Sequence, residues 1–236
     1  MKIFLSKDDA HIRQKPGLLD RFRTYRYTYL FVAILAQLTL LPLLEEQGRA
    51  LVPLLFLLIV VTVLWTLDIR RIFFWLCLGL GFVGSVVKLI VLMLSLPVKE
   101  AFYLILIGLS VNVLFLMIVI VIFLTKIFSE DKVTGESIKG GISIYFLLGY
   151  LWVYLYSLAL LVNPEAISFP AHASELSYIL YFSFTTLTTL GYGDITPVSL
   201  LARNLTILES TIGQIYLTVL IARLVGLQLA HRATRL

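Results

Sequence analysis

The chain has 236 residues, of which 60% are hydrophobic and only 14% are charged. This composition excludes an ordinary water-soluble protein and predicts an integral membrane protein surrounded by membrane lipids. The formal net charge of +5 could indicate a nucleic-acid partner, but the basic residues lie at the ends of apolar stretches rather than on one basic domain. We therefore expect no nucleic-acid binding.

Six apolar stretches are long enough to cross a bilayer as helices, which takes about 20 residues. They cover residues 25–44, 50–67, 72–95, 101–127, 141–162 and 205–229. A seventh apolar segment, residues 175–188, is too short to cross. Because backbone groups in lipid can bond only to one another, the sequence predicts an all-α integral membrane protein with six transmembrane helices.

Lys and Arg residues are distributed unequally between the two sides of these spans. With the basic amino-terminal segment, residues 1–24, taken as cytoplasmic, the opposite face carries only Arg49, Lys99 and Arg203. Cytoplasmic flanks retain positively charged residues. We therefore predict a multi-pass protein of the cell membrane with both termini in the cytoplasm.

A polar connection at residues 129–140 divides the spans into two groups. It is the longest polar stretch between spans, and it contains the flexible residue Gly135. Residues 25–128 before it predict a peripheral bundle of four transmembrane helices. Residues 141–236 after it hold one span, the short apolar segment and a final span.

The short apolar segment is expected to form a helix that ends inside the membrane. Pro164 and Pro170 break the helix after the fifth span, and Ser174 followed by Glu175 is suited to be an N-cap with an acidic residue in the first turn. Residues 190–193 then contain two glycines. Glycine reaches backbone angles that other residues avoid, so this run can line up carbonyl oxygens on one side.

Residues 188–194, Thr-Thr-Leu-Gly-Tyr-Gly-Asp, resemble the selectivity filter of the potassium channel family, with a short helix before it and a membrane span after it. Leu190 stands where that family usually has valine, and its side chain is expected to face away from the ions. Pro197, Arg203 and Gly213 stand where the family has a proline after the filter, an arginine and a glycine of the inner helix.

The resemblance implies a homotetramer in which rings of oxygen atoms replace the water around a potassium ion. The implied ligands are the carbonyls of Thr189, Leu190, Gly191 and Tyr192 and the Thr189 hydroxyl, with turn-forming backbone at Gly193 and support from Thr188 and Asp194. Residues 141–236 then form a pore module of outer helix, pore helix and filter (residues 175–194) and inner helix. Such a channel conducts K+ passively, needs no cofactor and is not an enzyme.

Four residues of the last span are candidates for lining the cavity or forming the gate: Gly213, Gln214, Leu217 and Ile221. The last three are spaced by three and four residues, so they share one face of a helix. Gly213 can act as a hinge or allow close helix packing, and the sequence leaves both interpretations open.

The four spans before the pore module resemble the arrangement of voltage-gated channels, in which the fourth span carries regularly spaced arginines. Residues 101–124 contain no Lys, Arg, Asp or Glu here. One elementary charge gains only ~2.3 kcal/mol per 100 mV, so steep voltage gating needs several moving charges. We therefore expect a channel that is not conventionally voltage-gated.

Lys88 in the third predicted span and Glu209 in the last are charged residues with apolar surroundings in the sequence. Lys88 either has a functional partner or extends its stem to the headgroups. Glu209 is expected to hydrogen-bond behind the filter or to pair with a neighbour.

Two other functions remain open on the same fold. A nonselective or sodium-permeable channel is disfavoured because Tyr192 and Gly193 complete the filter pattern. A nonconducting regulatory or assembly subunit would retain the fold without ion flux.

Overall fold

The computed structural model describes residues 25–47, 60–63, 71–94, 97–130, 132–170 and 175–233. Its labelled helices are α2 (Arg26–Gln47), α4 (Arg71–Leu94), α5 (Val98–Phe128), α6 (Gly135–Val162), α7 (Glu175–Leu187) and α8 (Leu200–Ala233). Two short strands, β1 (Ile167–Ser168) and β2 (Thr196–Pro197), pair antiparallel. The described part of the chain is therefore almost entirely helical.

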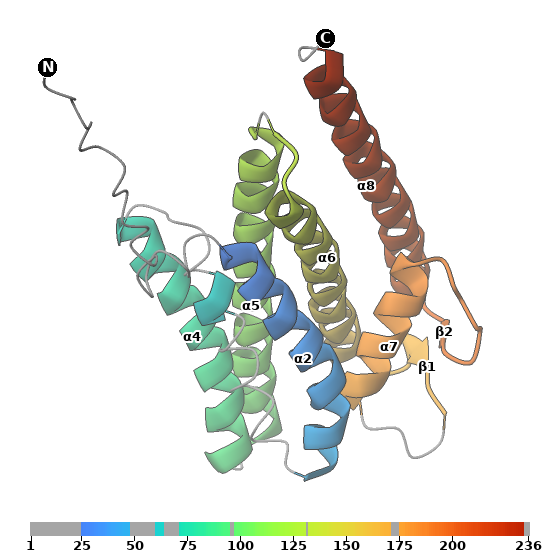
Figure 1. The fold of residues 1–236 in the computed structure, drawn as a ribbon. Coiled ribbons are helices and arrows are strands. Elements are labelled where there is room, and N and C mark those ends of the chain that lie inside the picture. The colour runs from blue at the N-terminus through green and yellow to red at the C-terminus, as the bar shows by residue number, and fades with distance from the viewer. Residues whose placement is uncertain are drawn as a thin grey trace, which may run out of the picture.

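The long helices stand side by side, and the short helix α7 fits against one end of them (Figure 1). α4 packs on α5, α5 on α6, and α6 on both α2 and α8. α7 contacts α6, α8 and α2. The connection from α5 to α6 lies at the same end as the carboxy terminus of α8, whereas β1 and β2 lie at the opposite end (Figure 1).

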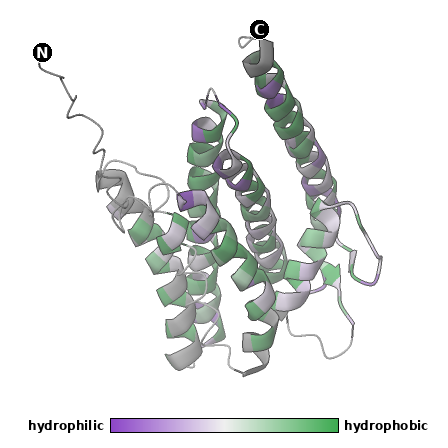
Figure 2. Cartoon of the chain, viewed as in Figure 1, coloured by the Kyte–Doolittle hydropathy of each residue, from purple (hydrophilic) through white to green (hydrophobic). Residues whose placement is uncertain are grey.

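Three helices among the described residues are long and apolar enough to cross a membrane: Val98–Phe128, Gly135–Val162 and Leu200–Ala230. Hydrophobic residues follow these helices over most of their length (Figure 2). They correspond to the predicted fourth, fifth and sixth spans. An all-helical chain with three such helices fits an integral membrane protein.

The other three predicted spans stay predictions. Residues 25–44 and 72–95 coincide with the helices α2 and α4, while residues 50–67 lie mostly outside the described residues. The segment at 175–188 forms the short helix α7. Ser174 lies outside the described part of the chain, as do the side chains of Glu175 and Lys88.

Helix α6 begins at Gly135, before the apolar span predicted to start at residue 141. The reason is a capping box: the Thr134 hydroxyl accepts a hydrogen bond from Ser137 N at 3.1 Å, and the Ser137 hydroxyl accepts one from Thr134 N at 3.4 Å. The second half of the predicted linker is therefore helical and belongs to α6.

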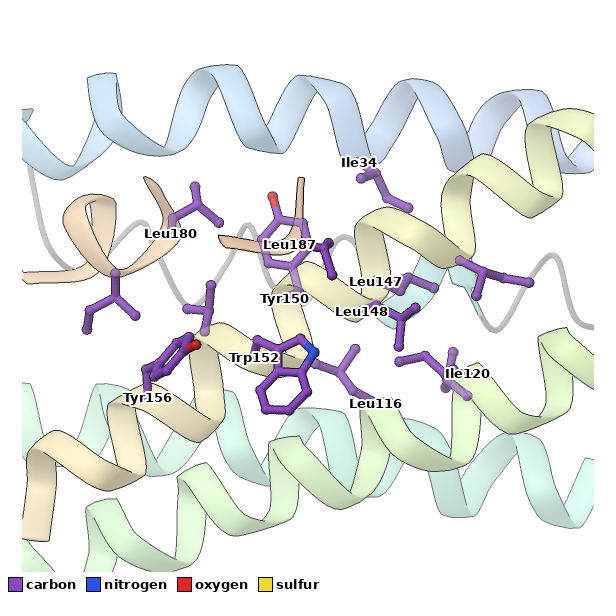
Figure 3. Packing of buried hydrophobic residues seen from close by; sticks show 14 of the residues in the cluster. Ile34, Leu116, Ile120, Leu147, Leu148, Tyr150, Trp152, Tyr156, Leu180 and Leu187 are labelled. Atoms are coloured by element: carbon purple, nitrogen blue, oxygen red, sulfur yellow. The ribbon is translucent and has the colours of Figure 1, made fainter. Parts of the chain in front are cut away.

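The apolar core is centred on α6. Leu116 and Ile120 of α5 lie against the side of α6 that carries Leu147, Leu148 and Trp152 (Figure 3). This packing holds α6 in place as the support for α7 and α8.

A glycine of α6 lies where the Phe184 ring of α7 approaches closely. A Cβ atom at Gly149 would lie 2.7 Å from the ring atom Cζ of Phe184. A side chain at this position would therefore displace the Phe184 ring or push α7 away from α6.

Glu136, in the first turn of α6, caps the beginning of α2. Its Oε2 accepts hydrogen bonds from the backbone N–H groups of Tyr27 and Thr28, both at 3.1 Å, and its Oε1 accepts one from the Thr28 hydroxyl. Lys139 Nζ lies 3.1 Å from Glu136 Oε1. A carboxylate at this place satisfies N–H groups that have no partner within α2 and complements the helix dipole.

The connection between α5 and α6 also contacts α8. Arg223 donates a hydrogen bond from Nη2 to the carbonyl oxygen of Glu130 at 2.9 Å, and its guanidinium lies 5.0 Å from the ring centroid of Phe128. The Ser137 hydroxyl donates to the Glu130 carboxylate. The carboxy-terminal part of α8 is thereby attached to the end of α5 and the beginning of α6.

Replacing Glu136 by Ala is expected to lower the melting temperature of the purified protein in detergent. The change removes the acceptor for three donors at the beginning of α2, a loss of about 1–3 kcal/mol. Circular dichroism during heating measures the shift. The control is Glu165→Ala, at an exposed residue outside the helices, which should leave the melting temperature unchanged. Equal shifts in the two variants would contradict the capping role.

Candidate functional site

Helix α7 ends at Leu187, and residues 188–194 lead the chain away from it. The N–H groups of Leu190 and Gly191 both bond to the carbonyl oxygen of Thr185, at 2.8 and 3.1 Å. Thr189 N bonds to the carbonyl oxygen of Thr186 at 2.9 Å. These bonds satisfy carbonyl groups that the last helical turn leaves free, and they hold the start of the segment against the end of α7.

Every second residue of this segment has a positive φ: 59° at Thr189, 52° at Gly191 and 81° at Gly193. In a regular strand, successive residues face opposite sides. Left-handed φ angles at alternate positions break that pattern, so that neighbouring carbonyl groups can face one side. Glycine adopts such angles without steric cost, whereas Thr189 is a non-glycine residue held in this conformation.

The segment is open on one side of the single chain. All residues from 188 to 194 are exposed, with Leu190 at 55% and Tyr192 at 67% of the maximum. The Tyr192 ring stacks on that of Tyr181 from α7, at 6.3 Å between centroids, and the Tyr181 hydroxyl is placed to hydrogen-bond Asp194. An open cavity of about 390 Å³ lies beside the segment, lined by Leu38 of α2, by residues of α7 and by Leu190 and Tyr192.

The return from the segment to α8 is held by backbone pairing. Ile167 pairs with Pro197 and Ser168 with Thr196 in the two-stranded sheet. Arg203 donates from Nε to the carbonyl oxygen of Pro197 at 3.3 Å. The proline and the arginine that the sequence singled out therefore interact with each other, at the start of α8.

Glu209 of α8 is fully buried and joins three helices. Its Oε1 accepts a hydrogen bond from the Ser183 hydroxyl of α7 at 2.6 Å, and its Oε2 accepts one from the Tyr156 hydroxyl of α6 at 2.6 Å. The Tyr156 ring also makes an edge contact with Phe182, at 4.9 Å between centroids. A buried carboxylate is stable only with such partners, so this cluster fixes α7 between α6 and α8.

Gly213 brings α8 into contact with the end of α7. A Cβ atom at Gly213 would lie 2.6 Å from the carbonyl oxygen of Leu187. That carbonyl also accepts a hydrogen bond from the Tyr145 hydroxyl of α6 at 3.0 Å. The close approach favours the packing interpretation of Gly213 over the hinge interpretation.

The other candidates of the last span have different surroundings. Gln214 reaches the segment: its Nε2 lies 3.5 Å from the Thr189 hydroxyl oxygen. Leu217 is half-buried against the core, and Ile221 is 59% exposed. Their roles in lining a cavity or forming a gate stay predictions.

Sequence reasoning did not single out Tyr145, Tyr156 or Ser183. Tyr145 and Tyr156 are eleven residues apart in α6, a spacing of three helical turns that places both on one face. A tyrosine in an apolar span usually needs a hydrogen-bond partner for its hydroxyl. That spacing was the available signal, but it does not identify Leu187 and Glu209 as the partners.

The groups of this site that could bind a ligand are mainly oxygen atoms. Among the described residues, no group of three or more His, Cys, Asp and Glu side chains could hold a metal ion. Segment 188–194 instead offers backbone carbonyl groups and threonine hydroxyls beside the end of a helix. Such oxygens can coordinate a cation without side-chain charge.

Residues 141–227 match the model of a protein family described as "Ion channel". The match covers less than half of the chain and includes most of α6, all of α7 and most of α8. No curated protein and no solved structure matched the chain. The similarity supports ion conduction as the general class of function and a membrane location, and it coincides with the part of the chain that holds segment 188–194.

Gly213→Ala is expected to destabilise the protein by about 1–3 kcal/mol, because the new methyl group would collide with the Leu187 carbonyl. Gly226→Ala on the same helix is the matched control, since a Cβ there has no neighbour within 4 Å. Ala is a better helix former than Gly, so the control should gain about 0.5–1 kcal/mol. Thermal unfolding in detergent measures both, and shifts of the same sign would contradict the close approach.

Glu209→Leu is expected to cost about 1–3 kcal/mol, because the buried Tyr156 hydroxyl loses its carboxylate acceptor. Glu209→Gln keeps a side-chain oxygen at nearly the same place and should cost less. The same thermal measurement compares them. Equal stability of Glu209→Leu and the unaltered protein would show that the cluster does not hold the three helices together.

Proposed function

We propose that this chain is one subunit of a potassium-selective channel, in which four copies surround a central pore and K+ passes down its gradient. The observation that carries the proposal is the backbone of residues 188–194, which has left-handed φ angles at Thr189, Gly191 and Gly193. The similarity of residues 141–227 to ion channels supports conduction, and the filter-like sequence supports potassium as the ion.

The proposed filter works by replacing water. The carbonyl groups of Thr189, Leu190, Gly191 and Tyr192, with the Thr189 hydroxyl, would form stacked rings when four chains meet, with Gly193 providing the turn. α7 serves as the pore helix in this proposal. Because the carboxy-terminal end of a helix carries partial negative charge, the end of α7 beside the filter favours a cation there.

A single chain leaves this site incomplete, which supports the homotetramer. Residues 188–194 are exposed, and only 17% of the most apolar stretch of α8 is buried within the chain. Exposed apolar residues of α8 include Ile207, Leu208, Ile212, Ile215 and Val219. Partner copies and membrane lipids would cover this surface, and four filters would close the rings.

The proposed topology keeps six spans in the cell membrane with both termini cytoplasmic. Helix α5, the fourth span, has Lys99, Glu100 and Lys126 only near its two ends. A change of membrane voltage does little work on an uncharged helix interior. We therefore propose a channel that is not conventionally voltage-gated.

Reconstitution of the purified protein in planar bilayers tests conduction and selectivity together. With potassium on one side and sodium on the other, the reversal potential should lie near the potassium equilibrium potential. A reversal potential near zero would indicate a nonselective cation channel. A confirmed tetramer without any potassium or thallium flux would indicate a nonconducting subunit.

Gly191→Val is expected to reduce potassium current at least about tenfold without preventing membrane insertion. Valine is strained by roughly 1–3 kcal/mol at the positive φ of this residue, so the filter backbone would change its path. Gly226→Val is the control, because that helical glycine has open space around it. Unchanged current in Gly191→Val would contradict conduction through this segment.

A further inference from the structure

Gln214 of α8 faces the hydroxyl group at the beginning of the proposed filter. Its Nε2 lies 3.5 Å from Thr189 Oγ1. The Thr189 hydroxyl donates its own hydrogen to the carbonyl oxygen of Thr188 at 2.6 Å. A hydroxyl has one hydrogen, so Oγ1 can only accept from Gln214, and the group that faces it must be the NH₂ of the amide.

The fold determines the position of this contact. The backbone of α8 at Gly213 lies against the carbonyl oxygen of Leu187, the last residue of α7. Tyr145 holds that carbonyl from α6, and the Tyr216 hydroxyl on the next turn of α8 donates to the carbonyl oxygen of Gly141 at 2.6 Å. Because these contacts fix the height of α8 relative to α7, Gln214 is kept level with Thr189.

We propose that Gln214 lowers the affinity of the innermost potassium site by hydrogen-bonding the Thr189 hydroxyl. This inference rests on the proposed function, in which that hydroxyl is the ligand nearest the cytoplasmic end. A hydroxyl oxygen has two lone pairs, and an amide N–H that occupies one leaves only the other for the ion. The N–H also directs its positive end toward the oxygen and so opposes a nearby cation.

The consequence for conduction is faster exchange at the inner mouth. Conduction requires binding that is strong enough to attract the ion and weak enough to release it. Gln214 would weaken the site that ions from the cytoplasm enter first. Its influence should therefore appear in the dependence of outward current on internal potassium, and not in the dependence of inward current on external potassium.

The variant Gln214→Met tests the inference, because methionine keeps a similar length but cannot donate a hydrogen bond. Since a contact of 3.5 Å is long for a hydrogen bond, we expect a modest effect. The internal potassium concentration for half-maximal outward current should fall about two- to fivefold, with the external value unchanged. Gln214→Asn, whose amide is too short to reach, should behave in the same way.

Gln228→Met is the matched control, since it makes the same chemical change on the same helix. Gln228 is exposed and lies fourteen residues further along α8, about 21 Å away. It should leave both half-saturating concentrations unchanged. In the background of Thr189→Ser, which keeps the hydroxyl, Gln214→Met should still produce its shift.

The outcomes separate this inference from the proposed function. If the unaltered protein carries no potassium-selective current, the proposed function fails. If it conducts selectively but Gln214→Met shifts neither value, shifts both equally, or loses its shift in the Thr189→Ser background, only the role of Gln214 is wrong. Loss of tetramer assembly in both Gln214→Met and Gln214→Asn would make Gln214 a structural residue and would also overturn the inference.

Discussion

The main constraint on this structure is the non-helical backbone of residues 188–194, which lies between apolar helices. A transmembrane helix satisfies its own hydrogen bonds, whereas irregular backbone at membrane depth is tolerated only where protein or a water-filled cavity surrounds it. Residues 188–194 follow a helix of 13 residues that is too short to cross a bilayer. Part of their hydrogen bonding returns to Thr185 and Thr186, and all seven residues are exposed in the single chain.

Polar contacts in the surrounding helices serve to place this segment. Glu209 holds the middle of α7 through Ser183 and is itself held by Tyr156, while Tyr145 and Gly213 meet at the last carbonyl of α7. The Glu209 carboxyl group, the tyrosine and serine hydroxyls and the last carbonyl of α7 would each be costly to bury without a hydrogen-bond partner. The hydrogen bonds between these groups therefore specify the position of α7, because α7 makes both sets of contacts in one position. The contacts of α7 with α6 and α8 thus fix the point from which residues 188–194 start.

The sequence predicted the short helix, the glycines with unusual angles and the last three spans, because these follow from local properties. A long apolar stretch indicates a membrane span, and closely spaced glycines indicate a backbone that leaves the helical conformation. Helix α6 begins before the apolar span predicted at residue 141, because Thr134 and Ser137 start the helix within polar sequence. Glu209 was expected to hydrogen-bond behind the filter or to pair with a neighbour. Its partners depend on how α6, α7 and α8 pack, and no local pattern in one sequence specifies that.

Helix α8 is held at two distant places, and this bears on how the front of the chain could influence the site. At Gly213 it rests against the end of α7, and at Arg223 it is bonded to the Glu130 carbonyl in the connection between α5 and α6. A displacement of α5 would therefore reach α8 through Glu130 and Phe128. The interior of α5 has no charge on which the membrane field could act. A force that moves α8 through this contact can arise from packing against α5 or from the end of the molecule where Glu136 and Lys139 fix the beginning of α2.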